Sequence, residues 1–214
     1  MPHVKWILPH APRQSVTANF GMIMPSWFDI KDFSFNSEED ERGMLTSVRM
    51  IEGIIRQEVD GGVDASRVVL GGFSQGGVTS LLGGLTSERR LGGVVVLSGW
   101  LPLRAKFKVV SEIVKPSSWC QLSEAKCFQM MSGHAKSLPI FWGHGTADPI
   151  VRFEFAKRSV EYLVGTCGLT RLDRDKIGSP GLTFVEYRGV EHSSCQEELN
   201  DLGEFLRRVV PESP

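Results

Sequence analysis

The segment at residues 71–77 does most to limit what this chain can fold into. Its sequence, GGFSQGG, contains G-x-S-x-G at 72–76, directly after a strand predicted over 67–73 and directly before a helix predicted over 75–87. In that setting the serine occupies a tight, strained turn, and we expect side chains at positions 72 and 76 to clash. The turn would raise the Ser74 hydroxyl above the carboxyl edge of a sheet and aim the Gln75 N–H at a developing oxyanion. A glycine-rich turn that holds a phosphate is the alternative, although the chain has neither GxxxxGK[ST] nor GxGxxG.

Strand-like and helix-like segments alternate along the rest of the chain. Apolar residues recur every three or four positions from Met44 to Val59, which predicts a helix that Gly61 and Gly62 end. Capping boxes are expected at Ser37 with Asp40 and at Ser194 with Glu197. Further helices are expected over 152–166 and 197–210, and strands over 4–8, 94–97, 138–143 and 182–187. This order predicts one α/β domain over 1–214, with a mostly parallel central sheet flanked by helices.

A catalytic serine needs a base, and that base needs an acid to orient it. In such sheets the three residues follow one another as Ser, Asp and His. Asp148 follows the strand predicted over 138–143, and His192 lies between the last strand and the last helix. The alternatives are a capping role for Asp148 near Pro149 and a surface position for His192. His144 beside Asp148 is a weak metal signal, and packing at the strand end is the better interpretation.

Composition excludes several classes of protein. Apolar residues make up 41% and charged residues 23%, which excludes a disordered chain. The formal charge of -1 gives no reason to expect a nucleic-acid partner, and no run reaches the ~18 apolar residues of a membrane span. Four cysteines without a CxxC pair, and no apolar leader near Met1, predict a cytoplasmic protein, with the nucleus as a further location.

With these motifs in place, the chain resembles the acyl-protein thioesterases, a group of the α/β-hydrolase superfamily that includes lysophospholipases and small carboxylesterases. The segments that carry the resemblance are PSWFD at 25–29, GGFSQGG at 71–77, LSGWLPL at 97–103, HGTADP at 144–149 and EHSS at 191–194. The family's nucleophile, acid and base fall on Ser74, Asp148 and His192. The resemblance implies hydrolysis of acyl thioesters on S-acylated proteins, and of lysophospholipids or small acyl esters, without a cofactor or metal.

The chain departs from this family near its start. Members usually begin with a further strand and an HG-x-GD-like turn that supplies a second oxyanion donor, and no such segment precedes Ser74. We therefore expect one or two N-terminal strands to be missing and a sheet edge to be open to pairing, for example in a homodimer. The alternative function is a catalytically impaired acyl-binding or dimeric interaction protein that lacks this oxyanion loop.

Two regions are candidates for substrate binding. Five apolar residues are expected to form an acyl groove, with plain core packing as the alternative: Met22, Met24, Trp27, Trp100 and Leu101. Residues 104–137 lack a clear period and are longer than the family usually has there. A lid or an insertion is one interpretation, with Trp119, Phe128, Met130 and Met131 as its apolar groups, and simple anchoring of the loop by these side chains is the alternative.

Overall fold

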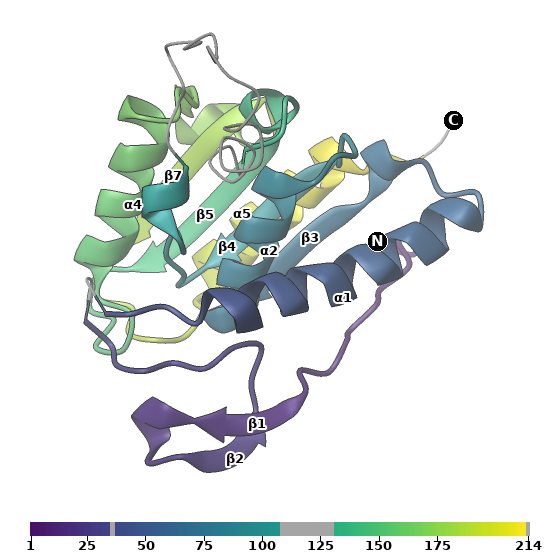
Figure 1. Cartoon of the computed structure of the whole chain (residues 1–214). Coiled ribbons are helices and arrows are strands. Elements are labelled where there is room, and N and C mark those ends of the chain that lie inside the picture. The colour runs from purple at the N-terminus through teal and green to yellow at the C-terminus, as the bar shows by residue number, and fades with distance from the viewer. Residues whose placement is uncertain (35–36, 108–130, 213–214) are drawn as a thin grey trace, which may run out of the picture.

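The computed structural model describes residues 1–34, 37–107 and 131–212, and its centre is a five-stranded sheet (Figure 1). The strand order is β3-β4-β5-β7-β6, and every neighbouring pair is parallel. The bounds are Val69–Phe73 for β3, Gly93–Leu97 for β4, Pro139–Gly145 for β5, Arg171–Leu172 for β6 and Gly181–Tyr187 for β7. The four longer strands match the predicted ones within a few residues, because each is a short apolar run between turn residues.

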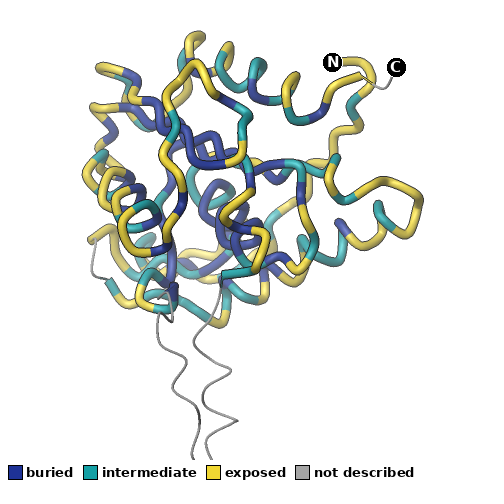
Figure 2. Tube along the Cα trace, turned by 90° about the horizontal axis from the view of Figure 1, so that it is seen from above, coloured by how far each residue is buried: buried dark blue, intermediate teal, exposed yellow. Residues whose placement is uncertain are grey.

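Helices cover both faces of this sheet. On one face lie α1 (Glu41–Asp60), α2 (Gln75–Thr86) and α4 (Phe153–Gly165), which bury one large apolar cluster against β3, β4, β5 and β7. On the other face lies α5 (Gln196–Val209), which buries a smaller cluster around Phe205. Figure 2 shows buried segments in the interior and exposed segments around them. The predicted α/β-hydrolase architecture, a mostly parallel sheet between helices, is thus confirmed.

The N-terminal region differs from the sequence prediction. Residues 4–8, expected as a strand, belong to no strand, and Leu8 is 83% exposed. Instead β1 (Arg13–Val16) and β2 (Met22–Pro25) form a separate antiparallel pair, which projects from the body below α1 (Figure 1). Phe20 and Gly21 turn the chain between them with positive φ. The prediction failed because residues 4–8 have no neighbouring strand among the described residues, so apolar character alone did not make them sheet.

Two helix starts also differ from the expected capping boxes. Asp40 itself caps α1, since its side chain accepts the N–H of Gly43 at 2.9 Å, and Ser37 takes no part in this cap. Cys195 occupies the cap position of α5 and makes no side-chain cap bond there. The predicted cap residues, Ser37 and Ser194, were therefore wrong by three residues and by one residue. A capping motif in the sequence locates a helix start only to within about one helical turn. The end of α1 was predicted correctly, with Gly62 at a φ of 98°.

Two further features bear on the predictions. Strand β3 lies at one edge of the five-stranded sheet, so the described chain has no partner strand on its outer side. Of residues 104–137, only 104–107 and 131–137 are described; Trp119, Phe128 and Met130 lie outside the described residues, and Met131 packs against the larger core. None of the helices in the described ranges is long and apolar enough to cross a membrane.

Candidate active site

Ser74 lies at the sharp turn between β3 and α2. Its φ of 52° and ψ of −121° are values that a non-glycine residue rarely adopts. The Ser74 N–H donates to the carbonyl of Leu97 at 2.8 Å, and the Ser74 carbonyl accepts the N–H of Val78 at 3.0 Å. These bonds hold a strained residue at the carboxyl edge of the sheet, as the sequence predicts for a nucleophile elbow.

The glycines around Ser74 are required for reasons that differ in part from the prediction. A Cβ on Gly72 would overlap the carbonyl carbon of Gly76, so the clash expected at position 72 is confirmed. A Cβ on Gly76 would meet nothing within 4 Å, so the clash expected at position 76 was wrong. The second restricted position is Gly77, where a Cβ would lie 2.9 Å from the Gly72 carbonyl oxygen. Helix α2 therefore packs against its own strand through the backbones of these glycines.

Asp148 and His192 form a hydrogen-bonded pair at the same edge. His192 Nδ1 lies 2.7 Å from Asp148 Oδ2, and the carboxylate is buried. The other oxygen, Oδ1, accepts the N–H groups of Ile150 and Val151, both at 2.9 Å. The sequence allowed two roles for Asp148, as the acid that orients a histidine or as a local cap. The carboxylate makes the contacts of both roles: Oδ2 contacts His192, and Oδ1 accepts the two backbone N–H groups.

Further hydrogen bonds join the turns that carry these two side chains. The N–H of Thr146 donates to the Tyr187 carbonyl at 3.0 Å, and that of Ala147 donates to the Val190 carbonyl at 3.0 Å. The N–H of Gly189 donates in return to Thr146 Oγ1 at 2.9 Å. The turns after β5 and β7 therefore behave as one unit, which fixes the distance between Asp148 and His192.

His144 lies beneath this pair and is fully buried. Its Nε2 lies 2.8 Å from the Val151 carbonyl oxygen, which makes Nε2 the protonated nitrogen. Burial lowers the pKa of His144, so the ring is neutral near pH 7. These contacts agree with packing at the strand end. No group of three or more His, Cys, Asp or Glu side chains suited to a metal occurs in the described parts of the chain.

The structure brings the His192 ring next to the elbow. The rings of His192 and Phe73, the residue before Ser74, have centroids 4.7 Å apart. The Ser74 hydroxyl makes no hydrogen bond to His192 among the residues that the structure describes. In free hydrolases the bond between nucleophile and base is often long or poorly aligned and tightens when substrate binds, so proximity is the relevant observation.

Gln75, the residue after Ser74, has a role that the sequence did not indicate. Its side-chain amide donates to the Phe28 carbonyl at 2.9 Å and accepts the N–H of Trp27 at 3.1 Å. It also lies within hydrogen-bond distance of the Ser26 hydroxyl. The segment PSWFD at 25–29 is thereby attached to the elbow, which explains physically why these two motifs occur in one chain.

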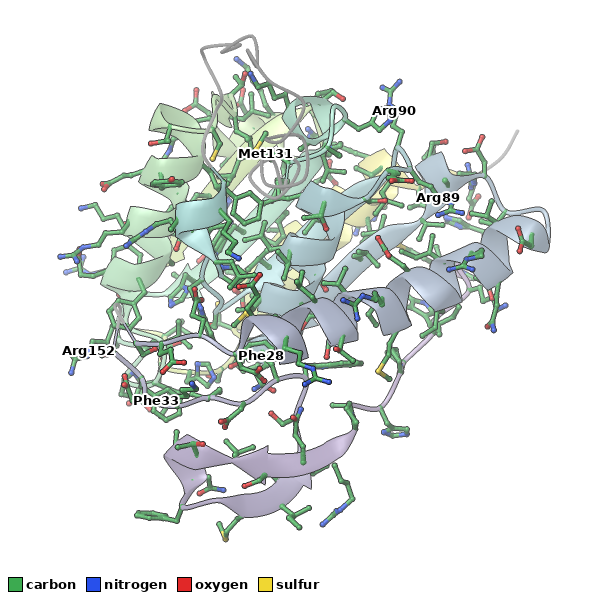
Figure 3. All side chains as sticks on the ribbon, viewed as in Figure 1. Phe28, Phe33, Arg89, Arg90, Met131 and Arg152 are labelled. Atoms are coloured by element: carbon green, nitrogen blue, oxygen red, sulfur yellow. The ribbon has the colours of Figure 1, made fainter. Side chains whose placement is uncertain are left out.

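A cavity of about 280 Å³ opens beside these segments, and we call it the Trp100 cavity. Apolar lining residues come from the loop after β2, from α1, from the segment after β4, from the loop after β5 and from α4: Phe28, Ile30, Phe33, Met44, Trp100, Leu101, Ala105, Ile150, Val151 and Phe155. Figure 3 shows Phe28 under the first turns of α1, and Phe33 and Arg152, which line an adjoining hollow, at the outer side. Ser74, Gln75, Asp148 and His192 do not themselves line this cavity. Three lining residues hydrogen-bond to two of them: the Phe28 carbonyl accepts from Gln75, and the N–H groups of Ile150 and Val151 donate to Asp148.

The five expected groove residues are divided between three places. Trp100 and Leu101 line the cavity. Trp27 packs against the larger core, and its carbonyl accepts from the hydroxyl of Ser47. Met22 and Met24 lie on the projecting strand β2, where they are 56% and 37% exposed and line no part of the cavity. The other lining residues were missed, although Phe28 belongs to the PSWFD motif, Ile30 follows it and Met44 lies in the first turn of α1.

Comparisons with known proteins show the family to which the chain is similar. The model of the phospholipase/carboxylesterase family matches residues 1–115 and 109–210. Acyl-protein thioesterase 1 of Cryptococcus neoformans is 47% identical over 98% of this chain and 81% of its own length, and that of Mycosarcoma maydis is 40% identical over 99% and 80%. The crystal structure of Arabidopsis thaliana SOBER1 superposes with a TM-score of 0.75 at 32% identity, covering 96% of this chain and 83% of the other.

Proposed function

The chain belongs to the phospholipase/carboxylesterase family, and from this premise we propose that it is an acyl-protein thioesterase, which removes fatty-acyl groups from protein cysteines. Family membership makes it a serine hydrolase of esters or thioesters. The finer assignment, to thioesters on S-acylated proteins, takes support from two relatives that carry the name acyl-protein thioesterase 1. Lysophospholipids and small carboxylic esters are secondary substrates in this proposal, and the cytoplasm or nucleus is the proposed location.

The observation that carries the proposal is the preformed Asp148–His192 pair next to the strained Ser74 turn. In the proposed reaction the Ser74 oxygen attacks the thioester carbonyl while His192 Nε2 takes the hydroxyl proton. Asp148 holds His192 by Nδ1, which leaves Nε2 free to act as a base and stabilises the imidazolium that forms. The same proton then goes to the departing cysteine sulfur, leaving an acyl-enzyme.

The second half of the proposed reaction restores the enzyme. A water molecule attacks the acyl-Ser74 carbonyl, His192 accepts a proton from that water, and the proton returns to the Ser74 oxygen as the fatty acid leaves. The Gln75 N–H is the proposed oxyanion donor in both halves. As the first residue of α2 it has no acceptor within the helix, and the helix dipole favours negative charge there.

The Trp100 cavity is the proposed site of the acyl chain. Burying a methylene group is worth about 0.8 kcal/mol, so an apolar cavity whose lining residues hydrogen-bond to Gln75 and Asp148 favours long chains over acetyl groups in this proposal. The lining also contains charged residues, among them Lys31 and Glu38, which form an ion pair at 2.6 Å.

Replacement of the nucleophile tests the reaction. We expect Ser74→Ala to lower the turnover of acyl thioesters and p-nitrophenyl esters by at least about 10³-fold and to abolish labelling by a fluorophosphonate. Thr79→Val, in the helix that follows Ser74, is the matched control, since within the described chain the Thr79 hydroxyl donates only to the Gln75 carbonyl. A wild-type chain that binds a palmitoyl substrate but neither hydrolyses it nor reacts with the fluorophosphonate would instead support the acyl-binding alternative.

A further inference from the structure

Glu39 is a half-buried carboxylate beside the Trp100 cavity, and it precedes the residue that caps α1. Its Oε2 accepts the backbone N–H of Leu103 at 2.7 Å. It also accepts a hydrogen bond from the Trp100 side chain and lies close to the Arg104 guanidinium. One carboxylate therefore contacts three residues of the loop that follows β4.

This loop needs to be held, because Leu103 has a left-handed backbone. Its φ of 50° and ψ of 33° are unfavourable for a leucine, yet its side chain is buried. Strained residues of this kind persist only when their surroundings fix them. The bond from the Leu103 N–H to Glu39 is one such restraint, and it acts at the strained residue itself.

The loop is restrained from two other sides as well. The N–H of Leu101 donates to the Ser159 hydroxyl of α4 at 2.9 Å. The Trp100 ring packs edge-on against Phe28, with centroids 6.1 Å apart and planes at 84°, and the Phe28 carbonyl accepts from Gln75. A connected set of contacts thus runs from the residue after Ser74, through Phe28 and Trp100, to Glu39.

We propose that Glu39 is a positioning residue for substrate specificity: its carboxylate fixes the Trp100–Arg104 wall, and this wall sets the preference for long acyl chains. The inference rests on the proposed function and deepens it by naming a residue that selects the substrate. Glu39 touches no reacting atom, and an acetyl group is too short to extend far along this wall. Each methylene buried against the wall changes affinity by roughly fourfold, so a displaced wall penalises long chains selectively.

The charge and the hydrogen bonds of the Glu39 carboxylate matter as well as its packing. Burial raises the pKa of Glu39, while the hydrogen bonds from Leu103 and Trp100 and the charge of Arg104 lower it. The charged form is therefore stabilised by the same groups that the carboxylate holds in place. An amide oxygen could still accept the Leu103 N–H, whereas an alanine could not.

The experiment compares Glu39→Ala, Glu39→Gln and wild type on acetyl, octanoyl and palmitoyl thioesters. Glu39→Ala should raise KM for the palmitoyl substrate about tenfold, because it removes hydrogen bonds to a charged group. Its kcat, and its kcat/KM for the acetyl substrate, should stay within about twofold of wild type. Glu39→Gln should bring KM for the palmitoyl substrate most of the way back to the wild-type value. Glu58→Ala is the matched control, since Glu58 lies near the other end of α1 and its side chain pairs only with Lys5 in the described chain.

Equal losses on the acetyl and palmitoyl substrates would overturn the inference, as would an unchanged chain-length profile. The rate of fluorophosphonate labelling shows whether Glu39→Ala still folds around an intact Ser74. A second readout is independent of turnover: the affinity of a fluorescent 16-carbon fatty acid should fall about tenfold in Glu39→Ala and not in Glu58→Ala. If the wild type is inactive but this difference in binding is found, the proposed function fails and the role of Glu39 in the wall stands. Equal affinities in all variants would refute that role.

Discussion

Among single residues, Glu198 is the buried carboxyl group that the proposed reaction does not use. It lies on α5 with 1% of its surface exposed, and its Oε1 lies so close to β5 that a Cβ on Gly143 would overlap it. Burial raises its pKa to about 7, the charge of Asp201 adds to this, and the nearby Ser194 acts in the opposite direction. Tyr187, whose hydroxyl donates to Asp201, also faces this region from β7.

This residue predicts a specific pH dependence of stability. A folded-state pKa of about 7 against an ordinary 4.5 means that the folded chain binds more protons between these values. The free energy of unfolding therefore falls as pH rises from 4.5 to 7 and is level above that range. At about 1.4 kcal/mol for each pKa unit, Glu198→Gln should gain roughly 2 to 3 kcal/mol on wild type between pH 5 and pH 8.

Urea titrations at several pH values measure this gain. Glu197→Gln is the control, because Glu197 is the neighbouring residue but is largely exposed and pairs with Arg174. If wild type and Glu198→Gln keep a constant difference in unfolding free energy from pH 5 to 8, the carboxyl group does not titrate in that window.

At the scale of elements, the arrangement of the acid and the base depends on two turns, which follow β5 and β7. Thr146 contributes a backbone N–H to one bond between them and a hydroxyl oxygen to another. Because it is exposed and touches neither reacting group, it can be changed without making a core cavity.

We expect Thr146→Val to lower kcat/KM about tenfold for all acyl lengths alike, since the loss of one hydrogen bond costs about 1 kcal/mol and loosens the Asp148–His192 geometry. Thr46→Val is the control, since the Thr46 hydroxyl bonds only to the Arg42 carbonyl on α1 within the described chain. A loss confined to long chains would place the effect of Thr146 in the cavity and would contradict this interpretation.

Elements were predicted well where a local pattern decides them and poorly where it does not. The spacing of apolar residues correctly predicted α1, and apolar runs bounded by glycines or other turn residues correctly predicted β3, β4, β5 and β7. The β1–β2 pair was missed because its short, mostly exposed strands lack a buried face that would leave a pattern. The capping box at Ser37 failed because Asp40 itself caps α1, and the box at Ser194 failed because Cys195 occupies the cap position of α5 and makes no side-chain cap bond there.

For the whole molecule, the main feature is one sheet shared by two apolar cores. Phe205 of α5 is fully buried in the smaller core, where its ring lies 6.0 Å from that of Phe141 on β5. Trp142, the next residue on β5, belongs to the larger core on the opposite face. Since neighbouring residues of the same strand serve both cores, we expect the chain to unfold in one cooperative transition.

Phe205→Ala should lower the free energy of unfolding by about 3 to 5 kcal/mol, because it leaves a cavity in the smaller core. Leu199→Ala, an exposed position on the same helix, should cost less than about 1 kcal/mol. Urea denaturation followed by both fluorescence and circular dichroism checks the result. Two separate transitions, or a loss for Phe205→Ala as small as that for Leu199→Ala, would show that the cores are independent.

The sequence by itself was enough to predict the proposed chemistry: GGFSQGG with its flanking strand and helix indicated the Ser74 turn, and the positions of Asp148 and His192 after later strands made them its proposed partners. It could do so because parallel strands end at one edge, which makes local order along the chain a guide to position in space. Only the tertiary structure decided which side chains form the cavity. Met22 and Met24 lie on β2 apart from it, while Phe28, Met44 and Glu39 border it together with Trp100. Such a wall depends on how loops from distant segments pack, and no periodic pattern within one segment records that contact.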